Sequence, residues 1–216
     1  MIGNHCSYQQ LVSDSDPLFD AFYAIYVDAI TLRERKPRSE IAAIAGRDDY
    51  SILLLKSAHA VIGFSIVYSP FNEQFCLLEY MAVHAGYRNM GLGRELFLHT
   101  FEHITQRCGP VYGLLEVDSD KEPSADQPMR KRRQQFYRRL GCLCIRDLSY
   151  LLPLPGEGEP PQMDLMVFQP SLLPPINRRQ LEHWLRVIYN NVYDCPADDP
   201  RIAQMMASVE DSVSLV

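Results

Sequence analysis

The segment LLEYMAVHAGYRNMGLGREL, residues 77–96, decides the fold. It begins with a run of apolar and aromatic residues typical of a β-strand, passes through a short turn and reaches glycines at positions 91 and 93. Residues 91–107 then repeat apolar side chains at helical spacing. We therefore expect a strand, a tight loop and a helix start at which several backbone N–H groups are unpaired and point to one spot.

The start of this helix is suited to a phosphate group. Gly91 and Gly93 leave room for a bulky pyrophosphate, and the helix dipole together with Arg88 and Arg94 favours its charge. Two common phosphate loops do not fit, because the dinucleotide fingerprint needs a third glycine where Leu96 stands and the P-loop needs Gly-Lys followed by Ser or Thr. The pattern indicates another kind of phosphate loop.

The segment from Arg88 to Gly93 resembles the Arg/Gln-x-x-Gly-x-Gly/Ala loop of the GNAT superfamily of acyltransferases. A second segment, Gln135 to Cys142, is similar to the family's Phe-Tyr-x-x-x-Gly-Phe signature, with Cys142 in place of the final aromatic residue. By the order of its elements, the resemblance extends over about residues 17–168. The C-terminal remainder has no counterpart in it.

The resemblance implies a fold and a cofactor. The fold is α/β, with a mixed, mostly antiparallel central sheet and a parallel strand pair splayed at the cofactor site. Apolar residues at helical spacing between 178 and 193 add a C-terminal helical extension, which the resemblance does not cover. The acyl donor is acetyl-CoA, whose pantetheine arm runs along the end of the strand and whose pyrophosphate sits on the loop. The implied cofactor-binding residues are Met81, Ala82, Val83, Arg88, Asn89, Met90, Gly91, Leu92, Gly93 and Arg94.

The resemblance also implies direct attack of a primary amine on the thioester. Tyr137 is then the candidate acid for the departing thiolate, and its alternative role is a packed aromatic in a helix. Glu79 and Glu116 are the candidate bases, because partial burial in an apolar strand raises the pKa of a carboxyl group. Glu79 ranks first because it lies on the motif strand. A solvent-facing position or a salt bridge is the alternative for each, and a water relay needs no base.

Hydrophobic periodicity predicts the remaining elements. Residues 118–129 are expected to form a loop, and residues 194–216 are expected to fray. For the domain organisation, we expect an acyltransferase domain at 1–169. A helical extension at 170–216 is expected to pack on this domain or on a partner subunit. Helices are expected at 17–32, 39–45, 91–107, 130–140 and 178–193, and strands at 50–56, 61–68, 75–83, 111–117, 142–152 and 163–168.

Composition narrows the class of protein. Apolar residues make up 47% of the chain and charged residues 22%, which is typical of a globular protein. The formal charge of −6 argues against nucleic acid or an anionic membrane as a partner. The six cysteines and six histidines lack the spacing of a metal site, and no leader or membrane span is evident, so we expect a cytoplasmic protein without a metal.

Several alternatives stay open at this stage. The leading hypothesis is acetyl transfer to a primary amine of an unidentified acceptor, and the alternative is a catalytically silent module that senses acyl-CoA or scaffolds a partner. Longer acyl groups and a homodimer are also compatible with the sequence. By the resemblance, the basic residues between 33 and 38 lie where the family shapes its acceptor site, which favours an anionic acceptor. A solvated connection is the default interpretation of these residues.

Overall fold

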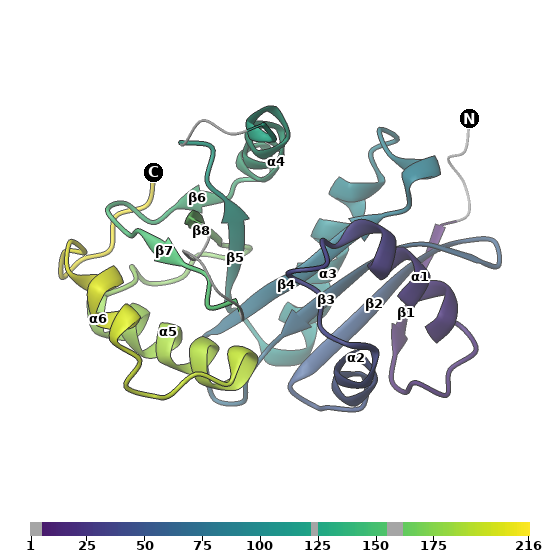
Figure 1. The fold of residues 1–216 in the computed structure, drawn as a ribbon, viewed down its shortest axis with the longest axis horizontal. Coiled ribbons are helices and arrows are strands. Elements are labelled where there is room, and N and C mark those ends of the chain that lie inside the picture. Colours follow the sequence, from purple (N-terminus) through teal and green to yellow (C-terminus); the bar gives the residue numbers. More distant parts are fainter. Residues whose placement is uncertain (1–5, 122–124, 155–161) are drawn as a thin grey trace. The chain divides into compact units, whose positions relative to one another are not determined.

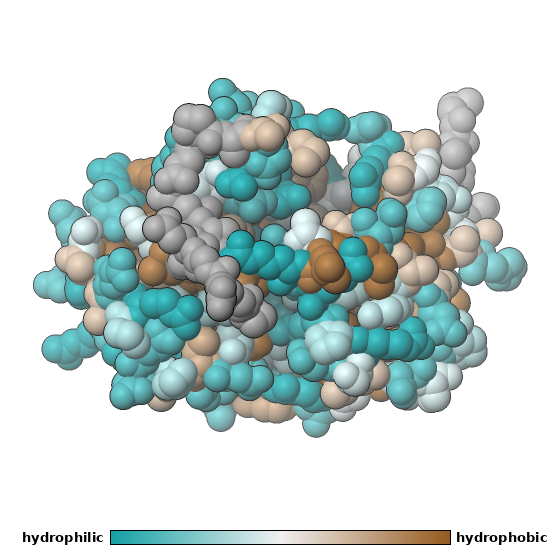
Figure 2. All heavy atoms as spheres, viewed as in Figure 1, coloured by the Kyte–Doolittle hydropathy of each residue, from teal (hydrophilic) through white to brown (hydrophobic). Residues whose placement is uncertain are grey.

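The computed structural model describes residues 6–121, 125–154 and 162–216. Contacts divide the chain into two compact units, Met1–Gly109 and Pro110–Val216, and each unit is described by itself. Figure 1 traces both units as a ribbon, and Figure 2 shows that hydrophilic residues cover most of the visible face. Within the described ranges, no helix has the length and apolar character needed to cross a membrane.

The first unit is a four-stranded antiparallel sheet with helices on both faces. Its strands are ordered β1-β2-β3-β4, and every adjacent pair is antiparallel. The elements are β1 (Cys6–Leu11), α1 (Phe19–Ala29), α2 (Arg38–Ala45), β2 (Tyr50–Ser57), β3 (Ala60–Tyr68), β4 (Phe75–Val83), the 3₁₀ turn η1 (Ala85–Tyr87) and α3 (Leu92–Cys108).

Alternation along β3 assigns the helices of this unit to opposite faces. The Phe64 ring packs against Phe22 of α1, with ring centroids 5.1 Å apart. The next residue, Ser65, hydrogen-bonds Thr100 of α3 through their hydroxyl groups at 2.7 Å. Because successive strand side chains point to opposite faces, α1 covers one side of the sheet and α3 the other.

A β-bulge interrupts this alternation in β4. Ile66 pairs with Tyr80 and Val67 pairs with Leu78, so Glu79 is the extra residue. The Tyr80 ring packs against Tyr26 of α1 at 5.2 Å between centroids. Glu79 forms an ion pair with Lys36 in the connection that follows α1. The bulge therefore brings two consecutive side chains to the α1 side of the sheet.

The second unit is also built on antiparallel strands. Its sheet has the order β5-β8-β6, and β7 also pairs with β8. The predicted boundary between residues 169 and 170 lies within this unit. Its elements are β5 (Tyr112–Asp118), α4 (Gln127–Arg139), β6 (Leu143–Cys144), β7 (Tyr150–Leu151), β8 (Gln162–Phe168), α5 (Arg178–Tyr193) and α6 (Pro200–Met206).

Helix α5 covers one face of these strands. The Tyr112 ring of β5 packs against Trp184 of α5 at 5.2 Å between centroids, and Glu116, on the same face of β5, accepts a hydrogen bond from Tyr193 at the end of α5. Helix α4 contacts the other face, since Gln134 donates to Asp164 of β8 at 3.0 Å and Asp164 pairs with Val117. The C-terminal helices are thus part of the core of this unit (Figure 1).

Most predicted elements are confirmed within a few residues, and the bounds predicted for β4 and α5 match those observed. The single strand predicted at 142–152 is wrong, because Asp147 adopts a left-handed conformation with φ of 60° and separates β6 from β7. The loop predicted at 118–129 ends early: Pro128 lies in the first turn of α4, where a proline needs no hydrogen-bonded N–H. Residues 122–124 of that loop lie outside the described residues.

Both ends of the chain contain structure that periodicity did not reveal. Strand β1 reads CSYQQL, a polar sequence, because it is paired on one side only, with β2. The prediction that 194–216 frays is wrong, since this stretch contains α6 and a terminal segment whose Val216 exchanges two backbone hydrogen bonds with Cys144. Buried Ile202, Met205 and Met206 hold α6 in place.

Candidate active site

The loop between β4 and α3 has the geometry of an anion site. Gly91 is the N-cap of α3 and has φ of 83°, a left-handed conformation that glycine adopts without strain. The amides of Arg94 and Glu95 both donate to the Gly91 carbonyl, at 3.0 and 3.2 Å. The amides of Leu92 and Gly93 belong to the helix start, where no carbonyl of a preceding turn is available. An exposed helix start with open amides attracts a phosphate.

Packing below the loop fixes its position. Leu92 is buried in a cluster with Leu55, Ile62 and Leu96, against which Met81, Val83 and Tyr87 also pack. The side chain of Arg88, in the loop, donates a hydrogen bond through Nε to the carbonyl of Val83, the last residue of β4, at 3.1 Å. The cluster joins the end of β4 to the start of α3, so it holds the two segments of predicted cofactor residues, 81–83 and 88–94, close together.

Glu79 is buried beside a lysine. Its side chain is 3% exposed, and its Oε2 lies 3.4 Å from Lys36 Nζ, whose side chain is 13% exposed. Burial raises the pKa of Glu79, while Lys36 and, to a lesser extent, the Tyr50 hydroxyl lower it. The other oxygen, Oε1, is buried without a hydrogen-bond partner among the described residues. A buried carboxylate oxygen without a donor is costly, which makes it a candidate for contact with a ligand.

Tyrosine hydroxyls hold the connection that carries Lys36. The Tyr26 hydroxyl accepts a hydrogen bond from the Lys36 amide at 2.7 Å, and the Tyr80 hydroxyl donates to the Glu34 carbonyl at 2.8 Å. Arg38, the first residue of α2, forms an ion pair with Asp20 of α1, and its Nη2 lies 2.5 Å from Asp20 Oδ1. Because Lys36 and Arg38 have acidic partners within this unit, they give little support to the expected anionic acceptor.

Glu116, the second candidate base, has a different environment. Tyr150 of β7 donates a hydrogen bond to its Oε1, and Tyr193 of α5 donates to its Oε2. Tyr150 is fully buried, and burial, followed by the nearby Glu116 charge, raises the pKa of its phenol well above 10.0. Both carboxylate oxygens are therefore engaged by tyrosines that belong to the same unit.

Tyr137 lies in the last turns of α4. Its ring packs edge-on against Phe136, with centroids 5.1 Å apart. Burial raises the pKa of the Tyr137 phenol to about 12, and the Arg133 charge opposes this rise. The group is protonated at neutral pH, as a proton donor must be. Cys142, which follows this helix, is fully buried, and burial raises the pKa of its thiol to about 12, as expected for a packing residue.

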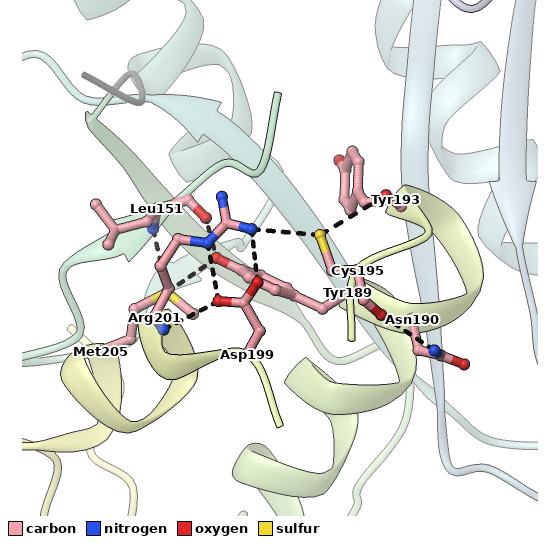
Figure 3. Close-up of polar contacts among 8 residues, drawn as sticks. All are labelled: Leu151, Tyr189, Asn190, Tyr193, Cys195, Asp199, Arg201 and Met205. Carbon is pink, nitrogen blue, oxygen red and sulfur yellow. Dashed lines mark hydrogen bonds and ion pairs between the residues drawn. The ribbon is translucent and has the colours of Figure 1, made fainter. Parts of the chain in front are cut away.

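The C-terminal helices are joined to β7 by a polar network (Figure 3). Arg201 pairs with Asp199 at 2.7 Å, donates to Cys195 Sγ at 3.3 Å and stacks over the Tyr189 ring at 5.3 Å. The Tyr189 hydroxyl donates to the Leu151 carbonyl of β7. Burial raises the pKa of the Cys195 thiol, so this cysteine is a poor nucleophile. The network stabilises the tertiary contacts of α5 and α6.

Basic side chains of α4 and the histidine His99 have structural partners within their units. In the basic helix α4, Arg130 pairs with Asp126 at 2.9 Å and Arg133 pairs with Asp118. His99 stacks on Tyr8 of β1, with ring centroids 3.6 Å apart. No group of three or more potential metal ligands occurs in the part of the chain that the structure describes.

The structure thus brings the cofactor loop and Glu79 into one unit and places Tyr137 and Glu116 in the other. Sequence reasoning missed the partners of the two carboxylates, namely Lys36 for Glu79 and the two tyrosines for Glu116. No local pattern could have revealed them, because each pair joins residues distant in the sequence.

The fold is α/β, and its strand-to-helix junction at Gly91 has a backbone geometry suited to a phosphate. Residues 48–141 match the family model described as an acetyltransferase (GNAT) domain. That match includes β2 to α4, and therefore the loop, both candidate bases and Tyr137. No curated protein matches this chain in sequence.

Solved structures give the same assignment of the fold. A GNAT-family protein from Bacteroides thetaiotaomicron is 23% identical, with a TM-score of 0.68 over 88% of this chain and 99% of the other. The ribosomal-protein-S18-alanine N-acetyltransferase from Escherichia coli is 18% identical, with a TM-score of 0.55 over 79% and 97%. An aminoglycoside 6'-N-acetyltransferase complexed with coenzyme A is 15% identical, with a TM-score of 0.59 over 78% and 99%. The chain has the GNAT fold.

Proposed function

We propose that this protein is an N-acetyltransferase that moves the acetyl group of acetyl-CoA to a primary amine. The observation that carries the proposal is the start of α3, where Gly91 adopts a left-handed conformation and the first amides of the helix have no preceding turn to donate to, which suits a pyrophosphate. The match of residues 48–141 to a GNAT acetyltransferase domain supports the same cofactor. The cofactor residues are those of the segments 81–83 and 88–94.

In the proposed reaction, Glu79 takes a proton from the acceptor amine, directly or through one water. The amine nitrogen forms a bond to the acetyl carbonyl carbon, and the bond from that carbon to sulfur breaks. The CoA thiolate leaves and receives a proton from Tyr137. Glu79 is preferred to Glu116 as the base because its Oε1 has no donor among the described residues, whereas both oxygens of Glu116 accept hydrogen bonds.

The direct test is a titration of acetyl-CoA into the purified protein by calorimetry, followed by release of free thiol across a panel of amines, polyamines, amino acids and peptides. Binding with amine-dependent thiol release supports the transferase and names its acceptor class. Binding without release for every amine favours the catalytically silent acyl-CoA sensor. Absence of binding contradicts both.

A further inference from the structure

We propose that Lys36 is a positioning residue for acetyl transfer: its ammonium group holds Oε2 of Glu79 and leaves Oε1 to receive the proton of the acceptor amine. This inference rests on the proposed function, because it gives the base a fixed orientation and a charge state. It assigns a role to the connection between α1 and α2, whose Lys36 lies on the α1 side of β4.

Geometry separates the two oxygens of Glu79. Lys36 Nζ lies 3.4 Å from Oε2, and Oε1 has no hydrogen-bond donor among the described residues. A carboxylate that accepts from a fixed cation at one oxygen is restricted in rotation, so its other oxygen points in a defined direction. A free surface glutamate would lack this orientation.

The bulge in β4 makes this arrangement possible. Glu79 is the unpaired extra residue of the strand, and its neighbour Tyr80 packs toward the same connection. The Tyr80 hydroxyl of β4 donates to the Glu34 carbonyl, which fixes the backbone before residue 35 to the sheet. The Tyr26 hydroxyl accepts from the Lys36 amide, which fixes the backbone after residue 35 to α1. Lys36 is therefore held in place through its backbone as well as its side chain.

Electrostatics give Lys36 a second effect on the base. Burial raises the pKa of Glu79, and the largest opposing influence is the Lys36 charge. Tyr50 of β2 and Arg47, which precedes it, also lower this pKa, and Tyr26 of α1 faces the same carboxylate. Among these groups, Lys36 lowers the pKa of Glu79 most, so its removal should leave Glu79 protonated up to a higher pH.

The test is the pH dependence of kcat/KM, expressed per concentration of unprotonated amine so that titration of the acceptor itself is removed. In Lys36→Met the acidic limb should move up by about one pH unit or more, and Lys36→Arg should return it close to the wild-type position. Lys56→Met is the matched control, because Lys56 donates to the side-chain carbonyl of Gln9 at 2.8 Å and forms no ion pair with a carboxylate of the described residues. An acidic limb that stays in place in Lys36→Met overturns the proposal.

A second measurement is independent of turnover and of whether Lys36→Met folds. In wild-type protein labelled with ¹³C at glutamate carboxyls, the Glu79 signal is identified by its loss in Glu79→Gln and followed through a pH titration. The expected result is a carboxylate that is ionised at neutral pH and keeps its titration in Lys36→Arg. A Glu79 that remains protonated through neutrality overturns the role of Lys36. If Glu79 titrates as expected but no amine releases thiol, the proposed function fails while the Lys36–Glu79 coupling stands.

Discussion

The two units carry one candidate carboxylate each, and the two differ in how their oxygens are satisfied. Glu79 in the first unit pairs with Lys36 at Oε2, is also influenced by the Tyr50 hydroxyl, and has no hydrogen-bond partner at Oε1 among the described residues. Glu116 in the second unit accepts tyrosine hydroxyls at both oxygens. Both glutamates lie in strands of apolar residues, so the residue type and its strand do not determine the role. The side chains around each carboxylate determine its role. A general base needs a carboxylate oxygen that is free to accept a proton.

The same contrast extends to the backbone. The first unit presents an exposed helix start at Gly91, whereas in the second unit Asn177 and Asp199 cap α5 and α6 with their own side chains. A capped helix start has fewer free amides to offer a ligand. The start of α3 is therefore more open to a ligand than the starts of α5 and α6, and the predictions below test that difference.

The largest effect is expected from Gly91→Val. A branched side chain is strained at φ of 83° and would project into the space proposed for the pyrophosphate. We expect the affinity for acetyl-CoA to fall by about 100-fold or more, the equivalent of one or two hydrogen bonds to a charged group. Calorimetric titration measures this loss.

Gly109→Val is the matched control, since Gly109 also has a positive φ, of 80°, and lies at the opposite end of α3 with no atom close to an added Cβ. It should lower the stability of the fold and spare the affinity. Equal losses of affinity in both variants would mean that Gly91 acts through the helix rather than through the ligand.

Glu79→Gln is expected to have the next largest effect. Loss of a general base should lower kcat/KM by about 10³-fold, with little change in acetyl-CoA binding. Steady-state thiol release measures the first quantity and calorimetry the second. If Glu116→Gln shows the larger loss instead, the roles assigned to the two carboxylates are reversed.

Tyr137→Phe should slow turnover by about 100-fold and spare acetyl-CoA binding, because water can replace the acid in part. With the pKa of the phenol raised to about 12, the wild-type enzyme should not lose activity through ionisation of Tyr137 at any pH below about 11. Unchanged turnover in the variant would make Tyr137 a packing residue.

The smallest effect on turnover is expected from Tyr193→Phe. It removes one hydrogen bond to the Glu116 carboxylate, and we expect the free energy of unfolding to fall by about 1 kcal/mol while kcat changes less than about twofold. Denaturant unfolding measures the stability. Tyr23→Phe is the control, since no hydrogen bond is recorded for its hydroxyl among the described residues, and its stability should match the wild type. A large loss of turnover in Tyr193→Phe would assign Glu116 a role in the reaction.

Sequence alone could predict the elements whose signals are contiguous. The junction of β4 and α3 carries its strand pattern, its glycines and its helix pattern within one segment, and it was predicted almost to the residue. Strand β1 was not predicted, because a strand paired on one side does not need an apolar pattern. The break between β6 and β7 was not predicted either, because it depends on the backbone conformation of Asp147, which cannot be inferred from hydrophobic periodicity.

In the candidate site, too, local features could be predicted from the sequence and tertiary contacts could not. The left-handed backbone at Gly91, on which the proposed phosphate contact depends, is a local feature that a glycine in the sequence indicates. The distinction between Glu79 and Glu116 depends on Lys36, Tyr150 and Tyr193, which only tertiary folding brings to them. The bulge that turns Glu79 toward Lys36 is likewise a property of strand pairing.

The central claim is that this chain transfers acetyl groups to amines, and the product itself tests it most directly. The protein is incubated with acetyl-CoA carrying a ¹³C-labelled acetyl group and with the amine that gives the fastest thiol release, and the amine is then analysed by mass spectrometry. The account predicts labelled N-acetylated amine in an amount equal to the CoA released, and none with Gly91→Val. Release of CoA without labelled amine would contradict the account, because it would mean that the thioester is hydrolysed rather than transferred.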